Sequence, residues 1–372
     1  MRVLHVITGL PVGGAETFLA ALTAQLQTHD IENHVIYFRS GPLVHHIKAQ
    51  GVPVYQVTGC ISLYDPLFFK RLYRLTKRIA PDCIHSSLWA ANVASRIVAF
   101  LLGIPHMSSF HNNLDQDGLI RTFFDRLTQN FSDILVPVST GVAQSLYARD
   151  PWIVPQRVTV IKNGINNYAL EQEAKVYPIT RKDIGLDTQH YIIGSVGRFV
   201  ALKNYPLLLE SFFDVQSRIP HARLLLMGQG PEEKKLRALT KERGLEDSVL
   251  FIIGHKAVPY YSLLDCFVLS SFKEGISIAL LEAMSFSRVC IVTSQDGLHD
   301  VIQHSYNGLL VPSDDKKSMV HALEWVFNDE PLRVQLGLQA AATVRRDFAL
   351  EHTTRLYSEV YQDMIDKRAY GS

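Results

Sequence analysis

Short apolar runs alternate with amphipathic segments along the whole chain, a pattern that is typical of parallel α/β proteins. In the first half, the pattern predicts strands at residues 3–8, 34–38, 52–57, 82–85, 105–109, 133–138 and 158–162. It then restarts, and it predicts further strands at residues 191–198, 222–228, 249–254, 265–270, 289–293 and 308–312. The polar stretch between the two blocks, residues 166–185, is expected to be an irregular linker. The sequence therefore predicts two doubly wound domains, and ligands in such sheets bind beyond the carboxyl ends of the strands.

Composition narrows the class of protein. A length of 372 residues accommodates two domains of ordinary size, and a net charge of +1 gives no indication of a nucleic-acid partner. The four cysteines form no CxxC pair, so we expect reduced thiols in a cytoplasmic protein. The first residues indicate a strand instead of a signal peptide, and the longest apolar runs are too short to span a bilayer.

Several loops after predicted strands carry groups that could meet an anion. Gly13 and Gly14 open a helix, where backbone N–H groups can approach a phosphate, but the GxGxxG pattern of nicotinamide-binding proteins is absent. Arg198 and Lys203 are cations in a loop that suits a diphosphate. His111 stands just past another predicted strand. Each segment also has an ordinary explanation on its own. The glycines would form a tight turn, the two cations would stand in a solvated loop, and His111 would make a local hydrogen bond.

The stretch FKEGISIALLEAM, residues 272–284, is apolar on nearly every side and yet contains two glutamates. A helix of this kind is an interior helix, so Glu274 and Glu282 are either solvated at its ends or face a polar cleft. Ser277 is a plausible helix cap, and the free N–H groups at that helix start would attract phosphate. Since ionised carboxylates accept hydrogen bonds from vicinal hydroxyls, this arrangement suggests a nucleotide sugar.

Two other patterns in the sequence carry weaker signals. Asp115-Gln116-Asp117 matches the DxD motif of metal-dependent glycosyltransferases, but so short a pattern arises by chance, and we expect neither a metal nor a cofactor. The predicted helix at 66–80 has a basic face, which is either simply solvated or docks on anionic lipid. The basic residues of that face are Lys70, Arg71, Arg74, Lys77 and Arg78.

Taken together, these motifs resemble the retaining glycosyltransferases of family four, the GT-B group that includes bacterial polysaccharide and lipopolysaccharide assembly enzymes. The resemblance covers nearly the whole chain, and it depends on the order and spacing of its motifs. These are GGAE at 13–16, KNGI at 162–165, GRFVALKN at 197–204, GQGP at 228–231, KEGISIALLEAM at 273–284 and NGLLVPSDD at 307–315. The chain departs from the family pattern at Ser277, where many members have proline.

The resemblance implies a GT-B fold, in which two Rossmann-like domains face each other across a cleft. Residues 1–170 would form the acceptor-side domain, and residues 171–350 would form the domain that binds the nucleotide sugar. A final helix within 351–372 would cross back to the first domain.

The resemblance also assigns site residues. Arg198 and Lys203 would neutralise the leaving diphosphate, Glu274 and His111 would meet the donor sugar, and these four are the expected catalytic residues. Glu282 would hold the ribose. The remaining donor-binding positions would be Gly13, Gly14, Gly254, His255, Gly275, Ile276 and Ser277.

The implied activity is a metal-independent retaining hexosyl transfer, from a nucleotide-diphosphate sugar to a hydroxyl of a growing surface glycan or a lipid-linked acceptor. A UDP-sugar is favoured over GDP-mannose as the donor. The protein would be cytoplasmic and could attach peripherally to the anionic inner membrane. A nucleotide-sugar epimerase of the same fold is the main alternative, and a two-domain solute-binding protein is a weaker one.

Overall fold

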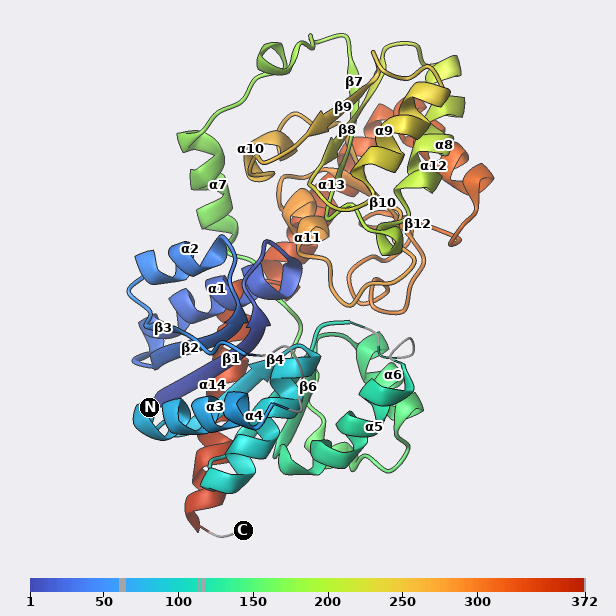
Figure 1. Ribbon diagram of the computed structural model, residues 1–372. Coiled ribbons are helices and arrows are strands. Elements are labelled where there is room, and N and C mark those ends of the chain that lie inside the picture. Colours follow the sequence, from blue (N-terminus) through green and yellow to red (C-terminus); the bar gives the residue numbers. More distant parts are fainter. Residues whose placement is uncertain (60–64, 113, 115–117, 371–372) are drawn as a thin grey trace. The chain divides into compact units, whose positions relative to one another are not determined.

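The computed structural model describes residues 1–59, 65–112, 114 and 118–370 (Figure 1). Two compact units divide the chain. The N-terminal unit is Met1–Gly164 together with Leu350–Ser372, and the C-terminal unit is Ile165–Ala349. The sequence placed these boundaries after residues 170 and 350.

The N-terminal unit is built on a parallel six-stranded sheet in the order β3-β2-β1-β4-β5-β6. Apart from the edge strand β3, its strands are buried on both faces, which explains why they can be recognised as continuous apolar runs in the sequence. The strands are β1 (Arg2–Gly9), β2 (Glu32–Arg39), β3 (Val54–Gln56), β4 (Cys83–Ser87), β5 (His106–Phe110) and β6 (Ile134–Pro137).

The prediction of a strand at 158–162 is wrong. Val158 forms only an isolated bridge with Leu135. The Thr159 N–H donates to the Leu135 carbonyl at 3.0 Å, and the Ile161 N–H donates to the Pro137 carbonyl at 3.2 Å. Pro137 has no N–H with which to donate in return, so the bonds run in one direction and no regular ladder forms.

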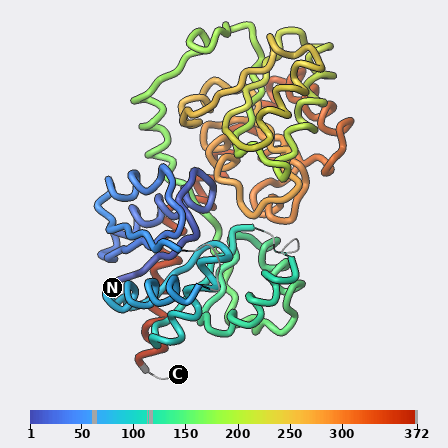
Figure 2. Tube along the Cα trace, viewed as in Figure 1, coloured from blue at the N-terminus to red at the C-terminus, as the bar shows by residue number. Residues whose placement is uncertain are grey.

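Helices cover both faces of this sheet. They are α1 (Gly14–Leu26), α2 (Leu43–Ala49), α3 (Pro66–Ile79), α4 (Trp89–Leu102), α5 (Leu119–Thr128), α6 (Thr140–Arg149) and α14 (Leu350–Tyr370). The start of α3 is fixed by Asp65, whose carboxylate accepts from the Leu67 N–H at 2.9 Å, and by Pro66 at the first helical position. The chain's last helix, α14, packs on α1 and β4 (Figure 2). There, the hydroxyl of buried Tyr361 lies 2.7 Å from Nδ1 of His85.

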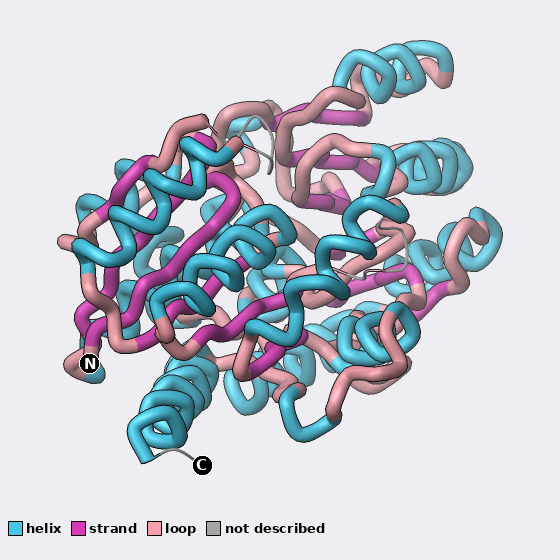
Figure 3. The backbone as a smooth tube through the Cα atoms, turned by 60° about the horizontal axis from the view of Figure 1, so that its bottom comes forward, coloured by secondary structure: helices cyan, strands magenta, loops and turns pink. Residues whose placement is uncertain are grey.

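The C-terminal unit repeats the topology, with the strand order β12-β11-β10-β7-β8-β9. Its strands are β7 (Tyr191–Val196), β8 (Ala222–Met227), β9 (Val249–Ile252), β10 (Cys266–Leu269), β11 (Val289–Thr293) and β12 (Leu309–Val311). Its helices are α7 (Asn167–Val176), α8 (Tyr205–Arg218), α9 (Glu233–Glu242), α10 (Val258–Tyr261), α11 (Ile278–Ser285), α12 (Lys316–Asn328) and α13 (Glu330–Asp347). Figure 3 shows helices packed alongside strands. The strand order reverses between β7 and β10, and in such sheets a ligand crevice lies at this switch point.

The linker expected at 166–185 is not irregular throughout, because it contains α7. The Asn166 side chain caps this helix by accepting from the Ala169 N–H at 3.0 Å. The residues that follow, ALEQEAK, are mostly good helix formers. The prediction of an irregular linker is wrong because the Asn166 cap and the helix-forming residues after it favour a helix in spite of the polar composition. In the structure, α7 packs against α10 and α11.

Cys83, Cys266 and Cys290 are buried free thiols. Within the described parts of the chain, none of the helices combines the length and the apolar character needed to cross a bilayer.

Candidate functional site

The loops that follow β7 and β10 are bonded to each other at the switch point of the C-terminal sheet. The Phe272 N–H donates to the Leu202 carbonyl at 2.9 Å, and the Ser270 hydroxyl donates to the Lys203 carbonyl at 2.9 Å. Residues Ala201–Lys203 form a single turn of 3-10 helix. Two segments about seventy residues apart in the sequence are thus held as one edge of the sheet.

Lys203 and Glu274 form an ion pair at this edge, between Nζ and Oε1. The Ser271 hydroxyl donates to the same Oε1 at 2.7 Å. Both side chains are mostly buried, at 20% and 11% exposed. An ammonium group has three donors and a carboxylate has two oxygens, so the pair retains free hydrogen-bonding capacity on both partners. The pair can therefore contact a ligand without separating.

Arg198 lies at the carboxyl end of β7 and is exposed. The GQGP turn at 228–231 supports its loop. The Phe199 N–H donates to the Gln229 carbonyl at 2.9 Å, and Gly228 has φ +146°, with no room for a Cβ beside the Gly197 carbonyl. The GQGP motif therefore acts through its backbone, since only glycine fits against the strand end that carries Arg198.

The apolar stretch at 272–284 forms the helix that its sequence predicts. Ser277 caps α11 by accepting from the Leu280 N–H at 3.4 Å. Gly275 and Ile276 are buried just before it. The first N–H groups of a helix have no partners within the helix and carry a partial positive charge, so the start of α11 favours an anion.

Glu282 is the acidic residue within α11. Its Oε2 accepts from the Tyr261 hydroxyl at 2.8 Å. Burial raises the pKa of Glu282 to about 7, the Tyr261 hydrogen bond works against that rise, and the nearby Glu173 carboxylate adds to it. Glu173 belongs to α7 and is itself paired with Lys256 at 2.8 Å. A carboxylate held in this way gains from ligand hydroxyls that donate to it.

Some of the residues that shape this edge could not be identified from the sequence. Tyr261 carried no motif, although a buried tyrosine usually finds a hydrogen-bond partner. Gly297, after β11, lies so close to the backbone of Glu274 and Gly275 that an added Cβ would collide with their carbonyl oxygens. A glycine in a loop was the available signal, but its partner is visible only in the fold.

Gly254 and His255 follow β9, and both are exposed. Gly254 has φ +76°, which favours glycine, and the His255 ring lies 6.4 Å from that of Tyr260. His255 directly precedes Lys256, so this loop is tied to α7 through the Lys256–Glu173 ion pair.

The other site residues expected from the sequence, Gly13, Gly14 and His111, belong to the N-terminal unit. Gly13 precedes α1, and the Glu16 carboxylate occupies the space that a Cβ at Gly13 would need. His111 follows β5, and its ring lies 6.1 Å from Phe18 of α1. Burial lowers the pKa of His111 to about 4, so its imidazole is neutral, and its buried Nδ1 has no partner among the described residues. The Asp115-Gln116-Asp117 motif lies outside the described residues.

Both halves of the chain match families of known proteins. Residues 176–343 match the family Glycosyl transferases group 1, and residues 12–167 match Glycosyltransferase Family 4. The chain is 25% identical to the lipopolysaccharide core biosynthesis glycosyltransferase LpsD of Rhizobium meliloti, over 99% of this chain and 100% of that protein. It is 23% identical to the UDP-Gal:alpha-D-GlcNAc-diphosphoundecaprenol alpha-1,3-galactosyltransferase of Escherichia coli, over 91% of each.

The fold has close structural relatives as well. Anabaena HepE, solved in complex with UDP and glucose, superposes with a TM-score of 0.87 at 17% identity, over 98% of this chain and 100% of that one. The two parallel six-stranded sheets and this likeness confirm the predicted two-domain Rossmann-like fold. The chain belongs to the group 1 glycosyltransferases of GT-B fold that assemble bacterial glycans, and its activity is glycosyl transfer from a nucleotide-sugar donor.

Proposed function

We propose that this protein transfers a hexose from a UDP-sugar, with retention of anomeric configuration and without a bound metal, to a hydroxyl of a lipid-linked or growing surface glycan. The observation that carries the proposal is the Lys203–Glu274 ion pair at the switch point, a few residues before the capped helix that contains Glu282. The two cations, the start of α11 and the two carboxylates then follow one another along this edge of the sheet. Their order suits the diphosphate, the sugar and the ribose of a nucleotide sugar.

The leaving diphosphate would be stabilised by fixed positive groups. Lys203 donates one of its three N–H bonds to Glu274, and the others are available to phosphate oxygens. Arg198 stands at the end of the same strand, and the first N–H groups of α11 add a partial charge. Groups that are positioned before the reaction need no reorganisation as charge develops, which is electrostatic catalysis.

Retention is proposed from the resemblance to retaining enzymes, and the surroundings of Glu274 bear on the route. Its Oε1 is engaged by Lys203 and Ser271, so the carboxylate suits contact with sugar hydroxyls better than attack on the anomeric carbon, which disfavours a covalent sugar–enzyme intermediate. We infer displacement on one face. The acceptor oxygen bonds to the anomeric carbon as the bond to the diphosphate breaks, and the hydroxyl proton passes to the departing phosphate oxygen.

The donor and acceptor classes draw support from the relatives. The Escherichia coli relative is named for UDP-Gal and a diphosphoundecaprenol acceptor, and HepE was solved with UDP and glucose. Glu282 would hold the ribose, Gly254 and His255 would lie near the base, and His111 with Gly13 and Gly14 would meet the donor from the N-terminal unit. An epimerase is not favoured, because the named relatives are transferases.

A lipid-linked acceptor would require a surface that can meet a membrane. In the N-terminal unit α4 packs against both α3 and α5, so these helices form one layer (Figure 1). All five basic residues of the α3 stripe are exposed, and so are four apolar residues of α5, namely Leu119, Ile120, Phe123 and Leu127. Basic and apolar side chains on one exposed layer are typical of surfaces that bind anionic membrane interfaces. We propose this layer as the membrane contact of a cytoplasmic enzyme.

A binding and turnover experiment tests the proposal. The purified protein is first screened by thermal shift against UDP, GDP and their sugars, since a ligand at a hundred times its Kd adds about 2.7 kcal/mol to stability. The stabilising donor is then incubated with lipid-diphosphate sugar acceptors in EDTA, and the product anomer is determined by NMR. Transfer with the donor's anomeric configuration is expected. An inverted product would contradict retention, and interconversion of the donor without acceptor would favour the epimerase.

A further inference from the structure

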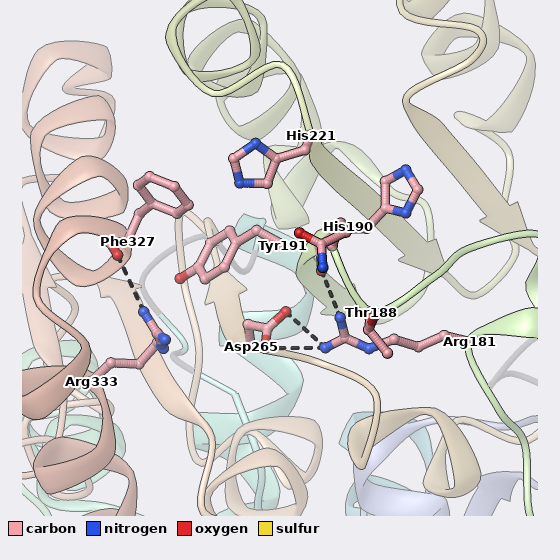
Figure 4. A pocket seen from close by; sticks show the side chains of 9 residues that line it. Arg181, Thr188, His190, Tyr191, His221, Asp265, Phe327 and Arg333 are labelled. Carbon is pink, nitrogen blue, oxygen red and sulfur yellow. Dashed lines mark hydrogen bonds and ion pairs between the residues drawn. The ribbon is translucent and has the colours of Figure 1, made fainter.

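A cavity of about 380 Å³ lies at the opposite edge of the C-terminal sheet, where β7, β8 and β10 begin (Figure 4). Tyr191 is the first residue of β7, His221 directly precedes β8, and Asp265 directly precedes β10. The strand β7 is six residues long, which separates this cavity from the Lys203–Glu274 edge by roughly 20 Å. The cavity is therefore distinct from the proposed donor site.

On one wall of the cavity, the charged side chains are paired with each other. Both Asp265 oxygens accept from Arg181 Nη2, at 3.0 and 3.2 Å, and one of them also accepts from the Ile192 N–H at 2.7 Å. Arg181 donates further to the His190 carbonyl at 2.6 Å. This Arg–Asp pair is tied to the backbone at both ends, so it forms a rigid, neutral wall.

The opposite wall carries the guanidinium of Arg333, which has no close carboxylate partner among the described residues. Arg333 donates to the carbonyls of Val326 and Phe327, at 2.9 and 3.2 Å, in the last turn of α12. Its closest ion-pair partner among the described residues, Glu330, is 3.9 Å away and 77% exposed. The Arg333 side chain is only 19% exposed. A guanidinium has five donors in a planar fork, so several remain available on the cavity side.

The floor of the cavity supplies a second donor. Tyr191 is 6% exposed, and its O–H has no acceptor among the described residues, because the neighbouring Arg333 guanidinium can only donate to it. Figure 4 shows this hydroxyl turned toward the Arg333 guanidinium, whose carbon lies 5.5 Å from the centre of the tyrosine ring. Burial raises the pKa of Tyr191, so the group remains a donor at neutral pH. A buried donor without a partner is costly unless something accepts from it.

We propose that this cavity is a second ligand site, beyond the donor and acceptor sites, and that it binds the phosphate monoester of a small metabolite. The phosphate oxygens accept from the fork of Arg333 and from the Tyr191 hydroxyl, and such charge-assisted, multiply bonded contacts are among the strong ones. The organic part of the ligand lies against the rings of Phe327 and His221, which are 5.5 Å apart.

The test is calorimetric titration of the full chain with glucose 6-phosphate, with inorganic phosphate and free glucose as the two component probes. In the wild type we expect the ester to bind, phosphate to bind more weakly and glucose not to bind. Arg333→Gln should weaken the ester roughly ten- to a hundredfold, the range for a charge-assisted bond. Tyr191→Phe keeps the aromatic packing and should weaken it roughly two- to tenfold.

Two controls separate this site from others. Lys203→Gln alters the opposite edge of the sheet and should leave binding of the ester unchanged, and Lys241→Gln removes an exposed cation from α9 and should also have no effect. If Arg333→Gln does not fold, Tyr191→Phe carries the test. Binding that persists in Tyr191→Phe and disappears in Lys203→Gln would assign the phosphate to the donor edge and overturn the proposal. Absence of binding by all phosphate probes at millimolar concentration would overturn it as well.

Discussion

Glu282 provides the most direct test of the site. Ionisation of its buried carboxyl is expected to lower the stability of the free protein and to strengthen the binding of a ligand that carries hydroxyls. Burial raises its pKa from an ordinary value of 4.5 to about 7. Between these values the unfolded chain releases the proton while the folded chain keeps it. The protonated carboxyl therefore contributes stability that is fully present below pH 4.5 and is lost as the pH rises through 7. At about 1.4 kcal/mol per pH unit, the cost of ionisation at pH 8 is on the order of 3 kcal/mol.

Glu282→Gln removes the ionisation and keeps an oxygen that can accept from Tyr261. Relative to the wild type, we expect its free energy of unfolding to be similar at pH 4.5 and higher by up to about 3 kcal/mol at pH 8. Urea unfolding can be followed by the fluorescence of Trp325, in a background that replaces Trp89 and Trp152, so that the signal reports the C-terminal unit.

A matched control exists in the same segment. Glu274→Gln leaves Lys203 without its carboxylate, so this variant should not be stabilised at pH 8. The reasoning about burial is refuted if Glu282→Gln gains no more stability at pH 8 than at pH 4.5.

The same substitution should weaken the nucleotide. If the ribose hydroxyls donate to Glu282, the loss of a charge-assisted bond should cost roughly ten- to a hundredfold in affinity for nucleoside diphosphate. The wild-type affinity should also rise with pH through about 7, because those hydroxyls favour the ionised carboxylate. A variant that is more stable and binds less well is the usual trade at a functional site.

Three further outcomes are expected. Gly297→Ala should displace the backbone of Glu274 and Gly275, so the transfer rate should fall at least tenfold while nucleoside diphosphate affinity changes little; wild-type rates would show that the close approach does not position Glu274. Transfer should persist in excess EDTA, because fixed cations meet the diphosphate, and abolition with rescue by Mn²⁺ would revive the Asp115-Gln116-Asp117 motif as a metal site. Reversing three charges of the α3 stripe should weaken flotation with anionic vesicles by about 1 kcal/mol per residue, and undiminished binding would leave the stripe as a solvated face.

The sequence predicted the strands well where burial on both faces makes them continuous apolar runs. It failed at 158–162, where the run is equally apolar but its neighbour ends in Pro137, which cannot return a hydrogen bond. It failed again at 166–185, where a polar composition concealed the capped helix α7. In each case a single residue decides the local structure, Pro137 in the first and Asn166 in the second. The average composition of a segment does not reveal the effect of one residue.

For the site, local signals could be predicted and partners could not. Ser277 as a cap follows from residue type and position, and the structure confirms that prediction. The pairing of Lys203 with Glu274, and the bond from Tyr261 to Glu282, join loops and helices far apart in the chain. They depend on which strands are neighbours in the sheet, and apolar periodicity does not determine strand order.

The two glutamates of the apolar stretch are therefore treated differently by the fold. Glu274 lies ahead of the helix and is matched by the cation of Lys203, so its charge is supported before any ligand arrives. Glu282 lies within the helix, has a hydroxyl from Tyr261 as its hydrogen-bond partner, and faces the added repulsion of Glu173. A charge that is costly in the free protein and relieved by hydroxyl donors gives binding energy to a ligand that carries them. A glutamate at that position lowers the stability of the free protein. Its presence in an interior helix is therefore expected where hydrogen bonds from a bound ligand offset the lost stability.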